Sequence, residues 1–174
     1  MITREFLKGD AASVAVYSDC EAYRYSLTRV WEKAGRRALF IMLNPSTATE
    51  MQNDPTVERC ERRARALHFG AFRVLNIFAY RATDPRDMRR ADDPVGPGND
   101  AAIAQGLSWA DQVICAWGTH GEHLNRGPHV EAMLRKAGGS LYHLGLSKAG
   151  HPKHPLYIGY QVQPVEWRNA DVRD

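Results

Sequence analysis

The chain has 174 residues, of which 44% are hydrophobic and 25% charged, with a formal net charge of +3. This balance excludes a wholly disordered chain, and the length predicts a single domain over residues 1–174. No stretch approaches the roughly 20 consecutive apolar residues of a membrane helix. The N-terminus has no apolar signal core either, so we expect a cytoplasmic protein without a membrane partner.

The positive charge is concentrated in residues 58–90. This segment holds nine arginines and four acidic residues, a local net charge of +5, whereas the remainder has a net charge of −2. The arginines could form a solvated helix face with ion pairs, or they could contact phosphate, because the planar guanidinium matches phosphate oxygens. For the second alternative we assign Arg59, Arg62 and Arg63 as phosphate-binding, which predicts a nucleic acid or nucleotide as partner.

The apolar pattern predicts a hairpin followed by alternating strands and helices. Residues 13–31 contain an apolar run, a polar turn and an alternating segment, as in an antiparallel hairpin. Nearly continuous apolar runs, typical of parallel strands covered on both faces, follow at 38–43, 72–79, 112–117 and 140–146. Helices are predicted between them at 57–69, 101–109 and 128–136. This order predicts an α/β fold with a central, mainly parallel four-stranded sheet and an additional N-terminal β-hairpin.

Polar residues gather where the predicted parallel strands end. Ligands of open parallel sheets bind beyond the carboxyl ends of the strands, so these residues are the first candidates for a site. In chain order the candidates are Asn44, Pro45, Ser46, Asn76, Arg81, Gly118, His120 and His154.

Three of these side chains carry the functional argument, and each has a structural alternative. Asn76 interrupts an apolar strand, so its amide either bonds a neighbouring loop or presents a donor and an acceptor to a nucleobase edge. Asn44, before Pro45, either ends a strand in a turn or positions a water or ligand. His154, before Pro155, is either a surface-loop residue or an imidazole held on extended backbone and aimed at a fixed point.

Other common chemistries lack their sequence signals. His120, His123 and His129 have no cysteine or carboxylate at a strong ligand spacing, so we predict no metal and no cofactor. We interpret residues 118–121 as a backbone nest near phosphate or a base. A P-loop motif and a GxSxG nucleophile elbow are both absent from the sequence. The three cysteines, Cys20, Cys60 and Cys115, lie far apart and form neither a disulfide framework nor a CxxC pair.

An ordered set of motifs resembles a known family. The motifs are Met42–Ala48, Asp54–Thr56, Asn76–Ala79, Arg81–Pro85, Trp117–Gly118 and His154–Leu156. Over about residues 10–160 they resemble the domain-of-unknown-function 1643 family, whose name supplies no activity. The order of elements is also similar, more distantly, to the uracil-DNA glycosylase superfamily, which implies a three-layer α/β sandwich.

The more distant resemblance implies roles for individual residues. By it, Asn44 corresponds to a residue that positions water, Asn76 to an amide that reads the base edge, and His154 to an imidazole that stabilises charge on the departing base. The sequence departs from that pattern at Ser46, in place of glycine or tyrosine, and at Leu156, in place of serine. The pattern assigns no base-stacking aromatic here, although three phenylalanines are available: Phe69, Phe72 and Phe78.

These observations lead to a main hypothesis and two alternatives. The main hypothesis is a glycosylase-like hydrolase acting on a nucleobase in nucleic acid or a nucleotide, because an imidazole and amide donors stabilise the charge that a departing base acquires. One alternative is a non-catalytic nucleic-acid or nucleotide binding module, which the departures at Ser46 and Leu156 favour. The other is a hydrolase or transferase for a small nucleotide metabolite.

Overall fold

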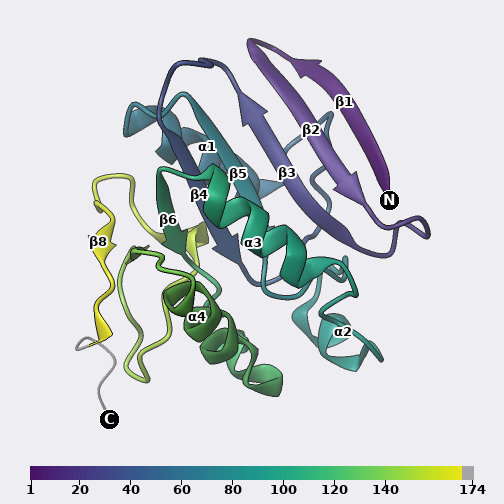
Figure 1. Ribbon diagram of the computed structural model, residues 1–174, viewed down its shortest axis with the longest axis vertical. Coiled ribbons are helices and arrows are strands. Elements are labelled where there is room, and N and C mark those ends of the chain that lie inside the picture. Colours follow the sequence, from purple (N-terminus) through teal and green to yellow (C-terminus); the bar gives the residue numbers. More distant parts are fainter. Residues whose placement is uncertain (170–174) are drawn as a thin grey trace.

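The computed structural model describes residues 1–169, whose strands form one sheet in the order β1-β2-β3-β5-β4-β6-β7-β8 (Figure 1). The strands are β1 Ile2–Lys8, β2 Ala11–Tyr17, β3 Arg24–Val30, β4 Arg37–Met42, β5 Ala71–Asn76, β6 Gln112–Cys115, β7 Leu141–His143 and β8 Val165–Glu166. The α-helices are α1 Pro55–Ala66, α2 Pro85–Arg90, α3 Asn99–Trp109 and α4 Arg126–Lys136, and two 3₁₀ helices are η1 Thr119–Asn125 and η2 Pro155–Tyr157.

The sheet is mixed, so the predicted central, mainly parallel four-stranded sheet is wrong. Among its seven pairings, β5–β4, β4–β6 and β6–β7 are parallel and the other four are antiparallel. The strands β2 and β3 lie where the sequence predicts a hairpin. They are part of the same sheet as the parallel strands, because β3 pairs antiparallel with β5. At the other end β8 adds a further antiparallel pairing with β7.

Helices cover both faces of the sheet and create two cores. On one face α1 packs against alternate residues of the central strands, among them Phe40 and Val74. On the other face α3 and α4 cover the intervening residues, such as Leu39 and Leu75 (Figure 1). This division follows from the period of two along a strand, which sends successive side chains to opposite faces.

Local signals explain where α1 begins. The side chain of Asp54 accepts a hydrogen bond from the N–H of Val57 at 2.9 Å, and Pro55 occupies the first turn. This cap satisfies one of the N–H groups that a helix start leaves without an internal partner. Because β4 runs toward this cap, the start of α1 lies at the carboxyl end of the parallel strands. Within residues 1–169 no helix combines the length and the apolar character that crossing a membrane requires.

Candidate functional site

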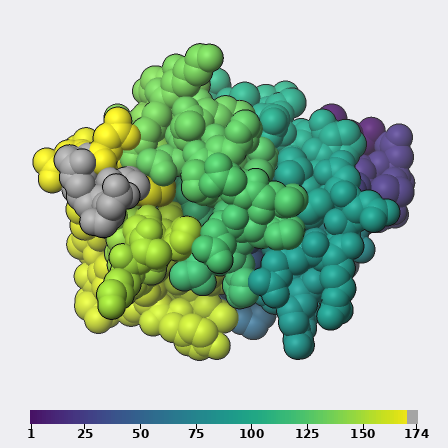
Figure 2. Space-filling view, turned by 90° about the horizontal axis from the view of Figure 1, so that it is seen from below, coloured from purple at the N-terminus to yellow at the C-terminus, as the bar shows by residue number. Residues whose placement is uncertain are grey.

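A cavity of about 510 Å³ opens at the carboxyl ends of β4 and β6. Its walls come from five segments: the loop after β4, the start of α1, the segment between β5 and α2, the loop after β6, and His154 with η2. Figure 2 looks onto this end of the molecule, where green surface after β6, teal surface around α2 and yellow surface of the C-terminal part adjoin, with a small blue area between them. The cavity therefore lies where open α/β sheets bind ligands.

The structure brings five of the predicted site residues together. All five line this cavity, although more than 100 residues separate the first from the last: Asn44, Ser46, Gly118, His120 and His154. Pro45 is adjacent in the chain, and its carbonyl accepts hydrogen bonds from Ala82 N–H at 2.9 Å and from the Asn44 side chain at 3.1 Å. The bond from Ala82 joins the loops after β4 and β5 to each other.

The imidazole of His154 has a fixed orientation. Its backbone is extended, with φ −68° and ψ 140°, and its Nδ1 accepts a hydrogen bond from the N–H of Leu156 at 3.3 Å. Burial lowers the pKa of His154, and the nearby charge of Asp54 opposes this only in part. The ring is therefore neutral at neutral pH, with its proton on Nε2, so Nε2 is a hydrogen-bond donor.

Gly118 lies in the loop after β6, directly beside His154. Its N–H donates to the carbonyl of Pro152 at 2.8 Å, and its φ of +75° lies in a region that side chains disfavour. A Cβ atom at this position would lie 3.4 Å from the Cβ of His154. A side chain here would have an unfavourable backbone conformation and would contact His154.

The side chain of Asn44 stabilises the turn after β4 and also lines the cavity. Its Nδ2 donates to the carbonyl of Ala82 at 2.8 Å and to that of Pro45. Among residues 1–169, no hydrogen bond involves its Oδ1, and the residue lines the cavity. The hydrogen bonds of Nδ2 fix the orientation of the Asn44 amide, so its Oδ1 is an acceptor in a cavity where the Nε2 of His154 is a donor.

Of the carboxylates in residues 1–169, that of Asp54 alone lines the cavity, and both of its oxygens already accept hydrogen bonds. Oδ1 accepts from Val57 N–H at 2.9 Å and Oδ2 from Ala48 N–H at 3.2 Å. The side chain is buried, with 8% exposed. It stabilises the loop and the helix start and is poorly placed to act as a general base.

The aromatic ring at the rim is one that the sequence interpretation missed. Tyr157 lines the cavity and is 90% exposed, whereas the three available phenylalanines, Phe69, Phe72 and Phe78, are all buried in the cores. Its position three residues after His154 was the only sequence signal.

Asn76 does not line the cavity. It is 2% exposed, ends β5 opposite Met42, and its backbone carbonyl accepts from the Asn99 side chain at 2.8 Å. Its own Nδ2 is buried without a hydrogen-bond partner among the residues that the structure describes. Neither predicted use of this amide, a loop bond or a ligand contact, is therefore visible.

Two of the predicted α1 arginines, Arg59 and Arg63, contact the C-terminal segment. Arg63 is 1% exposed and donates to three carbonyls, those of Ile158, Gly159 and Val162. Arg59 donates to the carbonyls of Pro155 and Ile158. The ring of Tyr160 lies 4.6 Å from the guanidinium carbon of Arg59 and 5.5 Å from that of Arg63.

The other two predicted arginines differ from each other. Arg62 is exposed and pairs with Glu58 at 2.7 Å. Arg81 donates to the carbonyl of Glu21 at 3.0 Å and lines an adjoining hollow of about 470 Å³ that shares Ser46 with the cavity. Arg62 thus agrees with a solvated helix face carrying ion pairs, whereas Arg59 and Arg63 bind backbone carbonyls, which neither interpretation of the basic segment predicts.

Metal ligands do not cluster in the described part of the chain, and its exposed thiol, Cys20, does not line the cavity. Residues 1–169 contain no cluster of three or more His, Cys, Asp or Glu side chains that could hold a metal ion. Burial raises the pKa of both Cys60 and Cys115, which keeps these thiols protonated.

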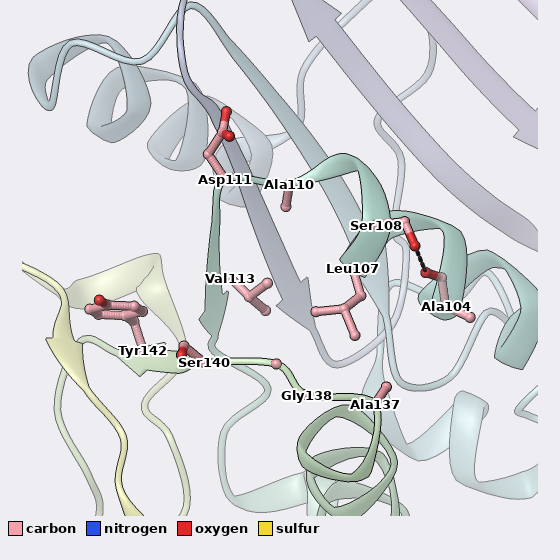
Figure 3. A pocket seen from close by; sticks show the side chains of 11 residues that line it. Ala104, Leu107, Ser108, Ala110, Asp111, Val113, Ala137, Gly138, Ser140 and Tyr142 are labelled. Carbon is pink, nitrogen blue, oxygen red and sulfur yellow. Dashed lines mark hydrogen bonds between the residues drawn. The ribbon is translucent and has the colours of Figure 1, made fainter.

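A second hollow, of about 540 Å³, lies at the opposite end of the parallel strands (Figure 3). Small residues at the carboxyl ends of α3 and α4 surround it, and the hydroxyl of Ser108 is bonded to the carbonyl of Ala104. Its carboxylate, Asp111, accepts a hydrogen bond from Arg37 N–H at 2.8 Å. It offers no set of free functional groups comparable to Asn44 and His154.

Comparison with known proteins identifies one family. Residues 24–156 match the model of a family described as "Protein of unknown function (DUF1643)". No curated protein and no solved structure matches the chain. The similarity to the uracil-DNA glycosylase superfamily is therefore not shown by these comparisons, and the function must be argued from the cavity.

Proposed function

The chain belongs to the DUF1643 family, whose description names no activity, and from its cavity we propose that it is a hydrolase that cleaves an N-glycosidic bond and releases a nucleobase. One observation carries this proposal: a fixed acceptor, Asn44 Oδ1, and a fixed donor, His154 Nε2–H, belong to the same cavity. Each side chain is oriented by a hydrogen bond at its other polar atom. Groups that are already oriented stabilise the charge that develops in a transition state without having to reorganise during the reaction.

In this proposal His154 stabilises the leaving group. When the N-glycosidic bond breaks, its electron pair goes to the base, and the Nε2–H of the imidazole donates to the developing anion. Because the ring is neutral, it stabilises that charge by hydrogen bonding.

Asn44 orients the nucleophile. A water held by Oδ1 attacks the sugar carbon that has lost the base, its oxygen forms the new C–O bond, and its proton goes to the base anion. An amide is too weak a base to deprotonate water beforehand, and the carboxylate of Asp54 is occupied by two N–H groups. Bond breaking therefore precedes water attack.

The apolar part of the lining suits a planar heterocycle. Trp117, Leu156 and the exposed ring of Tyr157 contribute to the cavity beside the polar groups. The volume of about 510 Å³ lies within the range of about 300–1,000 Å³ for small-molecule sites.

The test is release of free base from nucleosides, nucleoside monophosphates and oligonucleotides that carry normal or altered bases, followed by chromatography. We expect turnover of at least one substrate, with kcat lowered by roughly 100-fold or more in Asn44→Ala and in His154→Gln. Lys33→Ala, an exposed change in the turn before β4, serves as the control. No base release from any of the substrates, or unchanged kcat in both cavity variants, contradicts the proposal.

A binding module is the second candidate, because the Nδ2 of Asn44 also has a purely structural task in joining two loops. This alternative predicts that a nucleotide raises the melting temperature of the protein while no base is released. His154→Gln would then reduce the thermal shift.

A further inference from the structure

The basic segment of residues 58–90 is largely neutralised within the molecule. Four of its nine arginines form ion pairs with carboxylates: Arg62 with Glu58, Arg65 with Asp10 and Glu61, Arg86 with Asp84, and Arg90 with Asp87. The pairing of Asp84 with Arg86 lowers the pKa of that carboxyl to about 2. These ion pairs leave fewer guanidinium groups available to an external anion than the number of arginines in the segment indicates.

Four further arginines of the segment are held by other groups. Arg59 and Arg63 donate to carbonyls of the C-terminal segment, and Arg81 donates to the carbonyl of Glu21. Arg73 donates to the hydroxyl of Thr28 at 2.9 Å and lies over the ring of Trp109. None of these four is free to follow a polyanion.

Arg89, on α2, is the exception. It is exposed, and among residues 1–169 it has no hydrogen bond, ion pair or aromatic partner. It lines a hollow of about 310 Å³ together with His120, Glu122 and His123. His120 also lines the main cavity, so the free guanidinium stands beside the place where we locate the base.

This distribution bears on the size of the ligand. Proteins that bind a nucleic-acid strand commonly neutralise several phosphates, and their affinity falls steeply with salt. Among the residues that the structure describes, Arg89 is the one unpaired arginine of the basic segment that adjoins the cavity, which matches one phosphate group. The carboxylate of Glu122 also lines this hollow, so a phosphate there depends on the contact with Arg89.

We propose that the substrate is a free nucleoside monophosphate, with its base between Asn44 and His154 and its phosphate on Arg89 and His120. The proposal rests on the proposed function, which it deepens by naming the substrate class. The guanidinium supplies a charge-assisted contact, and the neighbouring hollow supplies the space beyond the cavity.

The experiment compares Arg89→Ala with Arg90→Ala. The two changes remove the same charge from adjacent residues of α2, but Arg90 is paired with Asp87 and lines neither the cavity nor the hollow beside His120. Substrates are a nucleoside, its 5′-monophosphate and an oligonucleotide with the same base. We expect Arg89→Ala to raise KM for the monophosphate roughly 10- to 100-fold and to leave the nucleoside unaffected. Arg90→Ala should change neither, and the oligonucleotide should be the poorest substrate.

The possible failures are distinguishable. Preferential cleavage of the oligonucleotide, with a steep salt dependence, overturns the monophosphate inference and leaves the hydrolase proposal intact. Equal effects of Arg89→Ala and Arg90→Ala also overturn the inference. If no substrate releases base, the hydrolase proposal fails, and binding of the monophosphate is then measured by the rise in melting temperature that it causes. A rise that is lost in Arg89→Ala but kept in Arg90→Ala supports the inference. No rise in the wild type overturns the inference.

Discussion

Arg63 of α1 donates a hydrogen bond from Nη1 to the carbonyl of Val162 at 2.7 Å, although the two residues are 99 positions apart in the chain. The other terminal nitrogen of the same guanidinium donates to the carbonyls of Ile158 and Gly159. These bonds hold the segment that directly follows His154. One wall of the cavity thus depends on a buried arginine that does not touch the cavity.

Arg63→Ala should therefore loosen residues 155–162. We expect it to lower the free energy of unfolding by about 2–4 kcal/mol, because it removes three charge-assisted hydrogen bonds from a buried position. Arg62→Ala, on the next position of the helix, should change stability by less than about 0.5 kcal/mol, since its ion pair is exposed. Urea denaturation measures both, and equal losses would contradict the assignment.

Replacement of Gly118 should affect both stability and the site. Gly118→Ala places a side chain at φ +75° and in contact with His154, and we expect a cost of about 1–3 kcal/mol together with weaker ligand binding. Gly138→Ala is the matched control, because its φ is +88° and no atom lies within 4 Å of the added Cβ. The control should lose stability but retain ligand binding. Similar ligand affinities for the two variants would show that Gly118 does not position His154.

Stability should depend on pH through His154. Burial lowers its pKa in the folded state, so the unfolded chain binds the proton more tightly. The contribution of the neutral ring is present above the ordinary pKa of 6.5, declines as the pH falls below that value, and is fully lost below the lowered pKa of the folded state. Denaturation curves between pH 8 and pH 5 should show a weaker pH dependence in His154→Gln than in the wild type. Parallel profiles would rule out this contribution.

Asn76 provides a separate test of the sequence interpretation. Its buried Nδ2 lacks a partner among the described residues, so Asn76→Leu should leave stability unchanged or raise it by up to about 1–2 kcal/mol. The measurement is the urea midpoint together with base release. Loss of turnover in a variant of unchanged stability would instead assign the amide to the ligand, as the more distant resemblance implies.

The sequence predicts those parts of the fold that have a strong local pattern. The apolar runs of β4, β5 and β6 and the Asp54 cap of α1 can be read directly. In contrast, β1 mixes charged and apolar residues, β8 has two residues, and the joining of β3 to β5 is a non-local pairing without a local signal. The mixed sheet could therefore not be read from the pattern.

The same distinction applies to the site. Asn44 and His154 can be found because each precedes a proline at the end of a predicted strand or loop. Arg63 is misread because its partners are backbone carbonyls, which have no sequence signature, in a segment 99 residues away. Tyr157 belongs to the segment that Arg63 holds, so the sequence does not predict its position at the cavity either.

The attachment of residues 155–162 to α1 makes two elements far apart in the chain act as one side of the cavity. The first residues of α1, including Thr56, line the cavity themselves, and η2 contributes Leu156 and Tyr157. Because Arg59 and Arg63 hold the segment to the helix, this side is in place before a ligand arrives. A ligand therefore does not have to order residues 155–162 on binding, which removes that entropic cost from its affinity.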